Sequence, residues 1–269
     1  MLRVGCQTYT WEMRGDKWNG RVDEILNAVA EAGYEGVEIT NTMIREYADR
    51  PADFAKALKA RGLFLAAFAY ASPAGFTDPA ARASELAGAE RALGFVEAFP
   101  GAPLCLGGAS SPDRSQVDDK IGLAAEFYSE VGRRGHKAGV DVAFHPHSHH
   151  GSILESRAEY DRIMALTDAE FVHWNPDTGH IVRGGQDLLD TLRRYASRIR
   201  HVHLKDAGAD NNWRALGKGI CGVAGVLNLL EKEIGYSGWI VAEEESAEAW
   251  SDPIGAIRWN RGYLKSLGY

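Results

Sequence analysis

Short apolar runs alternate with amphipathic segments along most of the chain. Amphipathic segments end in a glycine, and a β-branched or aromatic run follows within a few residues, at Gly33, Gly62, Gly139 and Gly235. Glycine readily takes the left-handed conformation that ends an α-helix, so each of these glycines marks the end of a helix before a strand. The hydrophobic spacing of Val22–Val29 is typical of such a helix. The pattern therefore predicts strands and helices in regular alternation.

The apolar runs predict eight strands. They cover approximately residues 3–9, 36–40, 63–69, 103–107, 140–146, 171–176, 199–204 and 239–243. Strict alternation of strand and helix is typical of a parallel sheet, and eight such units close best as a barrel. We predict an α/β fold, a (β/α)8 TIM barrel, formed by a single domain over residues 1–269. A doubly wound open sheet is the alternative, but it would spread the strand ends along a line instead of around a mouth.

Composition narrows the class of protein. With 269 residues, 45% of them hydrophobic, the chain is long enough for one large domain with a substantial core. The net charge of −7 argues against nucleic acid as a partner. The start of the chain lacks the apolar region of a signal peptide, and no apolar run approaches membrane-spanning length. Cys6, Cys105 and Cys221 are far apart and are expected to be buried thiols. We expect a cytoplasmic protein that does not bind membranes.

Candidate metal ligands gather at the ends of four predicted strands. Eight of the nine histidines lie between His145 and His203, and the carboxylates of 243–245 follow. Side chains alternate along a strand, so one face is shared by each of the pairs His145 and His147, Asn175 and Asp177, His201 and His203, and Glu243 and Glu245. A barrel carries its active site at the carboxyl ends of its strands. Mixed imidazole and carboxylate ligands suit Zn²⁺, Mn²⁺, Fe²⁺ or Co²⁺, whereas an all-oxygen set favours Mg²⁺ or Ca²⁺.

Four motifs in order carry a family resemblance. They are Asp177-Thr178-Gly179-His180, His201-Val202-His203-Leu204-Lys205-Asp206, Leu216-Gly217-Lys218-Gly219 and the run from Tyr236 to Glu243. Together they resemble the sugar isomerase/epimerase barrels related to xylose isomerase. Within that family, the histidines after the fifth strand resemble those of inosose dehydratases and of lyases that cleave 3-keto-glycosides or C-glycosides.

The resemblance implies a divalent metal, most often Mn²⁺, with Mg²⁺, Co²⁺, Zn²⁺ or Fe²⁺ as other occupants. Its ligands carry over to His145, Asp177, His203 and Glu243. Most relatives have Glu where this chain has His145. His145 matches the ligand position, but His147 is the alternative ligand, and the residues leave this choice open.

Other polar residues are assigned to substrate or to structure. By the same resemblance, His180 is a substrate contact as well as a catalytic residue, and Lys205 reaches a substrate oxygen. Glu38 occupies a position that is commonly acidic. Glu245 is either a second carboxylate at the mouth or a solvated rim residue, while Trp11 and Trp213 are candidates for an apolar wall against a sugar ring. His201 is expected to be a buried supporting residue and His173 a core residue. His149 and His150 either form only a polar loop or contribute one residue to the lining of the pocket.

These residues predict metal-assisted proton abstraction next to a carbonyl. Glu243, on the eighth strand, is assigned a catalytic role as well as that of a ligand. His147 is the natural base near neutral pH. The favoured outcome is β-elimination from a small keto-sugar or keto-cyclitol, by a dehydratase or a keto-glycoside lyase. The alternatives are a ketose 3-epimerase or aldose–ketose isomerase, and an apurinic-site endonuclease-like hydrolase. The sequence leaves open whether a second subunit, as a homo-oligomer or an accessory chain, completes the site.

Overall fold

The computed structural model describes residues 2–148 and 151–269, which form two compact units. The split unit combines the residues up to Ala67 with His201–Tyr269. The continuous unit is Phe68–Arg200. Among the described residues, no helix is both long enough and apolar enough to cross a membrane.

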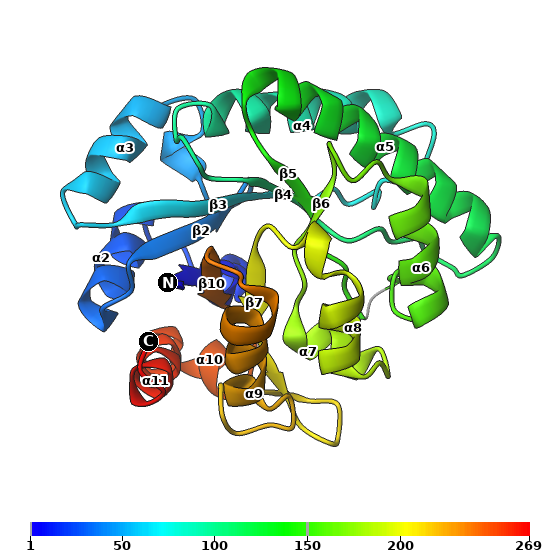
Figure 1. Ribbon diagram of the computed structural model, residues 1–269. Coiled ribbons are helices and arrows are strands. Elements are labelled where there is room, and N and C mark those ends of the chain that lie inside the picture. The colour runs from blue at the N-terminus through cyan, green and yellow to red at the C-terminus, as the bar shows by residue number, and fades with distance from the viewer. Residues whose placement is uncertain (1, 149–150) are drawn as a thin grey trace. The chain divides into compact units, whose positions relative to one another are not determined.

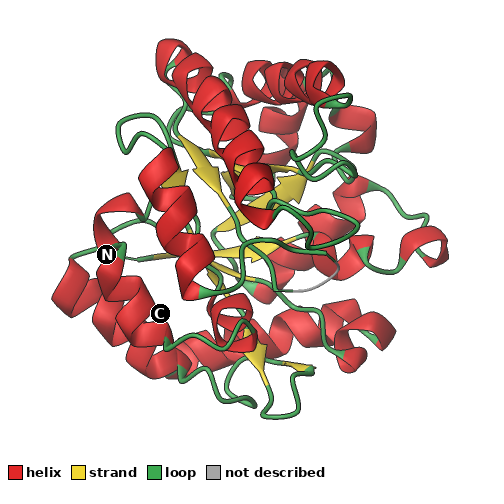
Figure 2. Cartoon of the chain, turned by 90° about the vertical axis from the view of Figure 1, so that its right-hand side faces the viewer, coloured by secondary structure: helices red, strands yellow, loops and turns green. Residues whose placement is uncertain are grey.

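The split unit contains a parallel sheet with the strand order β2-β1-β10-β7. Its strands are β1 (Arg3–Gln7), β2 (Gly36–Thr40), the beginning of β3 (Phe64–Tyr70), β7 (Val202–Leu204) and β10 (Trp239–Ala242), and a separate antiparallel pair is formed by β8 (Asp206–Ala207) and β9 (Trp213–Arg214). The antiparallel pair is visible as two short yellow strands near the lower edge of Figure 2. Its helices are α1 (Tyr9–Glu12), α2 (Val22–Ala32), α3 (Pro51–Lys59), α9 (Val223–Asn228), α10 (Ala247–Ser251) and α11 (Pro253–Ser266), with short helical turns at Gly15–Lys17, Arg45–Tyr47 and Leu229–Ile234.

Close packing fixes the register of the split unit. Gly5 on β1 has no side chain because a Cβ there would lie 2.9 Å from Val241 Cγ2 on β10. The buried side chains of Ala66, Trp239 and Val241 form a core cluster. Helices α2 and α11 contact each other and pack on β2 and β10 respectively. Strands held at this separation set where the polar residues at their carboxyl ends lie.

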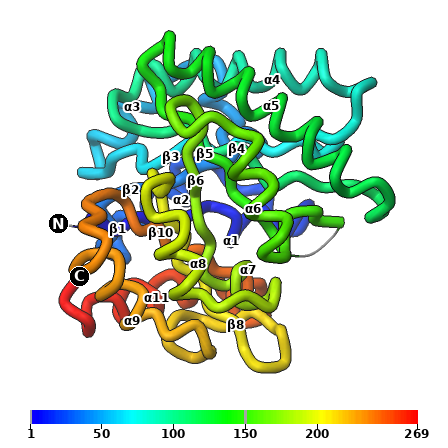
Figure 3. Tube along the Cα trace, turned by 45° about the vertical axis from the view of Figure 1, so that its right-hand side comes forward, coloured from blue at the N-terminus to red at the C-terminus, as the bar shows by residue number. Residues whose placement is uncertain are grey.

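The continuous unit repeats the strand–helix pattern in a single stretch of chain. Its strands, in sheet order, are the end of β3, β4 (Leu104–Leu106), β5 (Val142–Phe144) and β6 (His173–Trp174), all parallel, and its helices are α4 (Arg82–Val96), α5 (Val117–Ala138), α6 (Arg157–Leu166), α7 (Thr178–Arg183) and α8 (Leu188–Arg194), with a short turn at Ala196–Arg198. Helices α4 and α5 run side by side across β4 and β5 in Figures 1 and 3. Aromatic rings fill the interior, where Phe76 stacks on Phe127 at 4.6 Å and Tyr128 on Phe144 at 5.3 Å between centroids.

The strands and helix ends follow the sequence pattern closely. Each predicted strand has a counterpart among the described residues, shorter by a few residues in most cases. Gly33 and Gly139, which end α2 and α5, have φ values of 88° and 72°, as expected for left-handed helix-terminating residues. The three cysteines are buried, also as expected.

Candidate functional site

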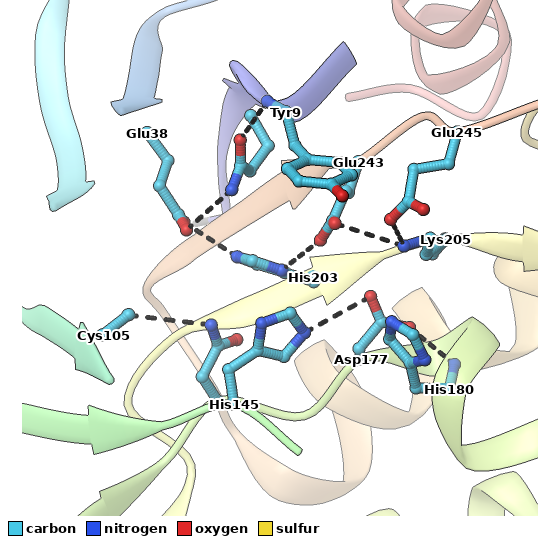
Figure 4. A network of polar contacts seen from close by, with 12 residues as sticks. Tyr9, Glu38, Cys105, His145, Asp177, His180, His203, Lys205, Glu243 and Glu245 are labelled. Carbon is cyan, nitrogen blue, oxygen red and sulfur yellow. Dashed lines mark hydrogen bonds and ion pairs between the residues drawn. The ribbon is translucent and has the colours of Figure 1, made fainter. Parts of the chain in front are cut away.

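In the split unit, a buried carboxylate joins two histidines, one just before β7 and one within it. Glu38 Oε2, on β2, lies 2.7 Å from His201 Nε2 and 2.8 Å from His203 Nε2 (Figure 4 shows the second contact). Both imidazoles therefore lie on one side of the segment 201–204, of which β7 is the last part, as the predicted alternation requires. Burial alone would raise the pKa of Glu38, but the positive charges and hydrogen bonds of His203 and His201 hold that pKa well below its ordinary value.

The other ring nitrogen of His203 lies against Glu243. The distance from Nδ1 to Glu243 Oε2 is 2.6 Å, and both side chains are almost fully buried. Burial disfavours a charged imidazole, yet the charges of Glu38 and Glu243 outweigh it and raise the pKa of His203 to about 10. Glu38 thus supports the ring at Nε2, while Nδ1 and Glu243 Oε2 face each other as an imidazole and a carboxylate that could bind one metal ion.

A buried lysine links the two glutamates that follow β10. Lys205 Nζ lies 3.2 Å from Glu243 Oε1 and also binds Glu245 Oε1 (Figure 4). The same ammonium lies 4.2 Å from the centre of the Trp213 ring, which is within cation–π range. Burial raises the pKa of Glu245 to about 7 despite the charge of Lys205, and the Glu243 carboxylate adds to the shift. Glu245 is thus a partly buried partner of Lys205 and not a solvated rim residue.

Asp206 holds the turn that carries the predicted Leu216–Gly219 motif. Its carboxylate is buried and accepts main-chain N–H bonds from Gly217, Gly219 and Cys221 at 3.0–3.1 Å. Residues 206–207 also pair with β9, which places Trp213 beside Lys205. The prediction that Asp206 orients its neighbours is confirmed.

In the continuous unit, Asp177 is the N-cap of α7, and its two carboxylate oxygens have different surroundings. Oδ1 accepts the main-chain N–H of His180 at 2.7 Å and caps the helix. Oδ2 is buried, accepts no hydrogen bond among the described residues, and lies 3.6 Å from His145 Nε2 (Figure 4). A buried carboxylate oxygen without a donor calls for a positively charged ligand, because its desolvation is otherwise uncompensated.

Three imidazoles gather beside Asp177. His145, His147 and His180 each bring one ring nitrogen within 4.8 Å of the others. Gly108, just after β4, allows this approach, because a Cβ there would lie 2.8 Å from the carbonyl oxygen of His145. The predicted shared face of His145 and His147 agrees with their ring separation of 4.6 Å. His149 and His150 lie outside the described residues.

One histidine differs from its prediction. His173 was expected in the core, but it is only half-buried and its Nε2 lies 3.5 Å from Asp141 Oδ1. The reason is that β6 consists of two residues, so His173 stands at its first position, where solvent reaches the side chain. The hydrogen bond from His173 lowers the pKa of Asp141 to about 2 against the effect of burial, with Arg200 adding to the shift.

Three polar residues of the site were not predicted. Gln7 Nε2, at the end of β1, lies 3.5 Å from Glu38 Oε1, and its own Oε1 accepts the main-chain N–H of Tyr9 at 2.5 Å. Burial and the nearby glutamates, Glu245 first, raise the pKa of Tyr9 to about 12. Ser148 contacts His180. Gln7 is the last residue of β1 and Tyr9 follows shortly after it, so a search for polar residues at the carboxyl end of the first strand would have found both. No sequence pattern indicated Ser148.

Comparison with known proteins identifies the family. Residues 26–267 match the family described as xylose isomerase-like TIM barrels. An inosose dehydratase of Mesomycoplasma hyopneumoniae (strain J) is 27% identical over 303 aligned residues, which cover 99% of this chain and 96% of that protein. An inosose dehydratase of Clostridium beijerinckii is 30% identical over 161 residues, 53% of each chain, so this chain spans about half the length of that relative.

A solved structure shares the fold. The IolI protein with a bound zinc atom superimposes with a TM-score of 0.82 at 15% identity, covering 99% of this chain and 98% of that one. The predicted (β/α)8 architecture and the resemblance to a family of sugar-converting enzymes are thus confirmed. The chain belongs to the xylose isomerase-like TIM barrel family.

Proposed function

We propose that this protein is a divalent-metal-dependent lyase that abstracts a proton next to the carbonyl of a keto-sugar or keto-cyclitol and then expels a β-substituent. The observation that carries the proposal is the pair of imidazoles after β5, His145 and His147, in a chain similar over nearly its whole length to an inosose dehydratase. The name of that relative denotes loss of water from an inosose, which is a ketone of a cyclitol. The imidazoles offer a base near neutral pH.

We assign the metal to His145, Asp177, His203 and Glu243, on the family resemblance of these four positions. Two contacts within the separate units support the assignment: His145 beside the buried Oδ2 of Asp177, and His203 Nδ1 beside Glu243. Both pairs combine an imidazole with a carboxylate, a donor chemistry that fits Mn²⁺ and also Zn²⁺, Co²⁺ or Fe²⁺. Mn²⁺ is our first choice, and the zinc of the IolI protein makes Zn²⁺ the second ion to test.

Residues other than the ligands are assigned the proton transfers of the elimination. A bound divalent cation would polarise the substrate carbonyl and the neighbouring hydroxyl. His147 removes the α-proton, the electron pair forms the new carbon–carbon double bond, and the β-substituent departs with its bonding electrons. Glu245, with its pKa raised to about 7, supplies a proton to the leaving oxygen. Lys205, which binds Glu245 and lies over the Trp213 ring, is assigned with that ring to substrate binding.

The substrate we propose is neutral and carries no phosphate. The turn 217–219 offers a single cation, Lys218, and a phosphate normally requires several donors. The Lys218 ammonium already lies 3.9 Å from the centre of the Trp259 ring. A small polyhydroxylated ketone needs hydrogen-bonding groups and an aromatic surface instead, and these are what the site provides. Cytoplasmic location and assembly with a second subunit stay predictions.

Glu38→Gln is expected to weaken metal binding by about 10- to 100-fold. The amide keeps the size of the side chain but no longer holds the two Nε2–H groups of His201 and His203 with a full negative charge. Calorimetric titration of the metal-free protein with Mn²⁺ measures the change in the dissociation constant. Glu31→Gln, which removes an exposed carboxylate from α2, is the matched control. Unchanged affinity in Glu38→Gln would separate this carboxylate from the metal site.

Proton exchange tests the proposed reaction. In D₂O, the metal-loaded protein should exchange the α-proton of an inosose with solvent and then form an unsaturated product, both visible by proton NMR. Omission of the metal should abolish both signals. Interconversion of two ketose epimers without an unsaturated product would instead support the epimerase alternative. Cleavage of an oligonucleotide with an abasic site, without exchange on any keto-sugar, would support the endonuclease alternative.

A further inference from the structure

The main chain of the segment after β5 makes a hydrogen bond to the ring of His180. The N–H of Ser148 donates to His180 Nδ1 at 3.0 Å, and the Ser148 hydroxyl oxygen lies 3.0 Å from the same atom. The ring is 2% exposed, so this contact is sheltered from water. A main-chain N–H is always a donor, whereas the hydroxyl can be either donor or acceptor. His180 Nδ1 must therefore present its lone pair to Ser148.

The direction of this bond determines the tautomer of His180. In a neutral imidazole, one nitrogen bears the hydrogen and the other accepts. With Nδ1 as the acceptor, the hydrogen is on Nε2, and Nε2 has no lone pair to bind a metal ion or to accept a proton. We infer that Ser148 is a positioning residue that fixes His180 as the Nε2–H tautomer, so that His180 acts as a hydrogen-bond donor to a substrate oxygen and not as a base or metal ligand.

A second contact holds the same residue. The main-chain N–H of His180 binds Asp177 Oδ1 at 2.7 Å, which sets the residue in the first turn of α7. Backbone and ring are thus held from opposite ends by Asp177 and Ser148. The three neighbouring imidazoles then differ in role. His145, whose Nε2 lies 3.6 Å from Asp177 Oδ2, is the proposed ligand, His147 keeps the role of base, and His180 donates.

The chemical use of this donor rests on the proposed function. A neutral imidazole N–H directed at a carbonyl oxygen polarises it and stabilises the enolate that forms, as positioned donors do in oxyanion holes. The hydrogen remains on Nε2 throughout the reaction, so the protonation state of His180 does not change. His180 therefore does not supply the proton that leaves with the β-substituent.

The tautomer can be measured without any substrate. Protein labelled with ¹⁵N-histidine, free of metal and then loaded with Zn²⁺, gives long-range ¹H–¹⁵N spectra in which His180 is assigned by its absence from His180→Asn. We expect an acceptor-type Nδ1 and a hydrogen-bearing Nε2 in both samples, and the same result in Ser148→Ala, which keeps the main-chain N–H. A hydrogen on Nδ1, a zinc-dependent change to coordination at Nε2, or a tautomer switch in Ser148→Ala would overturn the inference.

Two substitutions test the donor role. The amide of His180→Gln can place an N–H near the position of Nε2, whereas that of His180→Asn reaches only the position of Nδ1. We expect both variants to keep their metal, and His180→Gln to retain at least about 10-fold more kcat/KM than His180→Asn on an inosose. Equal losses in the two variants, or loss of metal from both, would contradict the donor role. If the wild-type protein does not act on keto-sugars, the proposed function fails, while the NMR experiment still decides the tautomer.

Discussion

His203→Ala is expected to abolish stoichiometric metal binding and to lower kcat/KM by about 10³-fold or more. The imidazole is the member of the proposed ligand set with both nitrogens engaged, Nε2 with Glu38 and Nδ1 with Glu243. Its removal deletes a ligand and leaves two buried carboxylates without the group between them. Elemental analysis of the purified variant and steady-state kinetics with added Mn²⁺ measure the two effects.

His201→Ala is the matched control for this experiment. His201 directly precedes the strand that carries His203, is equally buried, and is bound to the same Glu38 oxygen. We expect it to retain its metal, with an affinity reduced by no more than about 10- to 100-fold, because it supports the site from outside the ligand shell. Thermal denaturation of both variants shows whether each is folded. Equal loss of metal from both would favour an ion held by Glu38, His201 and His203, which also lie close enough together to bind one.

His147→Gln should retain the metal and lower kcat by about 10²-fold or more. Gln is similar in length to His and can preserve neutral contacts, but it cannot accept a proton at neutral pH. The α-proton exchange in D₂O should fall with turnover, because both require the same base. Comparison of the exchange rate with the rate of product formation shows whether proton removal or loss of the β-substituent has slowed.

His136→Gln provides the corresponding control, since His136 is an exposed histidine on α5. It should leave both metal content and turnover unchanged. If His147→Gln loses its metal while His145→Gln keeps it, the two residues exchange their roles of ligand and base. If His147→Gln is fully active, the base lies elsewhere and the imidazoles after β5 have another purpose.

The fold was predictable because it depends on local patterns. Glycines such as Gly33 and Gly139 end helices for a conformational reason that a sequence displays directly, and buried strands such as β10 are continuous apolar runs. His173 was misjudged because the length of a strand is less certain than its existence. The prediction extended β6 toward its amino end, whereas the strand begins at His173 itself.

Most residues of the site could be predicted from the sequence, but their interaction partners could not. Strand alternation correctly placed His201 beside His203 and Glu243 beside Glu245. The partners that decide their chemistry come from other strands or from the main chain. Glu38 on β2 joins His201 and His203, and the donor to His180 Nδ1 is a backbone N–H that carries no side-chain signature. Such contacts depend on register and loop conformation, which one sequence does not specify.

The interrupted chain path of the split unit has a consequence for biosynthesis. Strand β1 pairs with β10, which leaves the ribosome almost a full chain length later, whereas the continuous unit has all its strands within one uninterrupted stretch. During translation, Phe68–Arg200 is available as a whole before His203 or Glu243 has been made. The first 67 residues are made long before the rest of their unit, and until His201 and His203 follow, Glu38 lacks both of its histidine partners. Strand β1 therefore exposes the edge that pairs with β10 until residues 239–242 have been made.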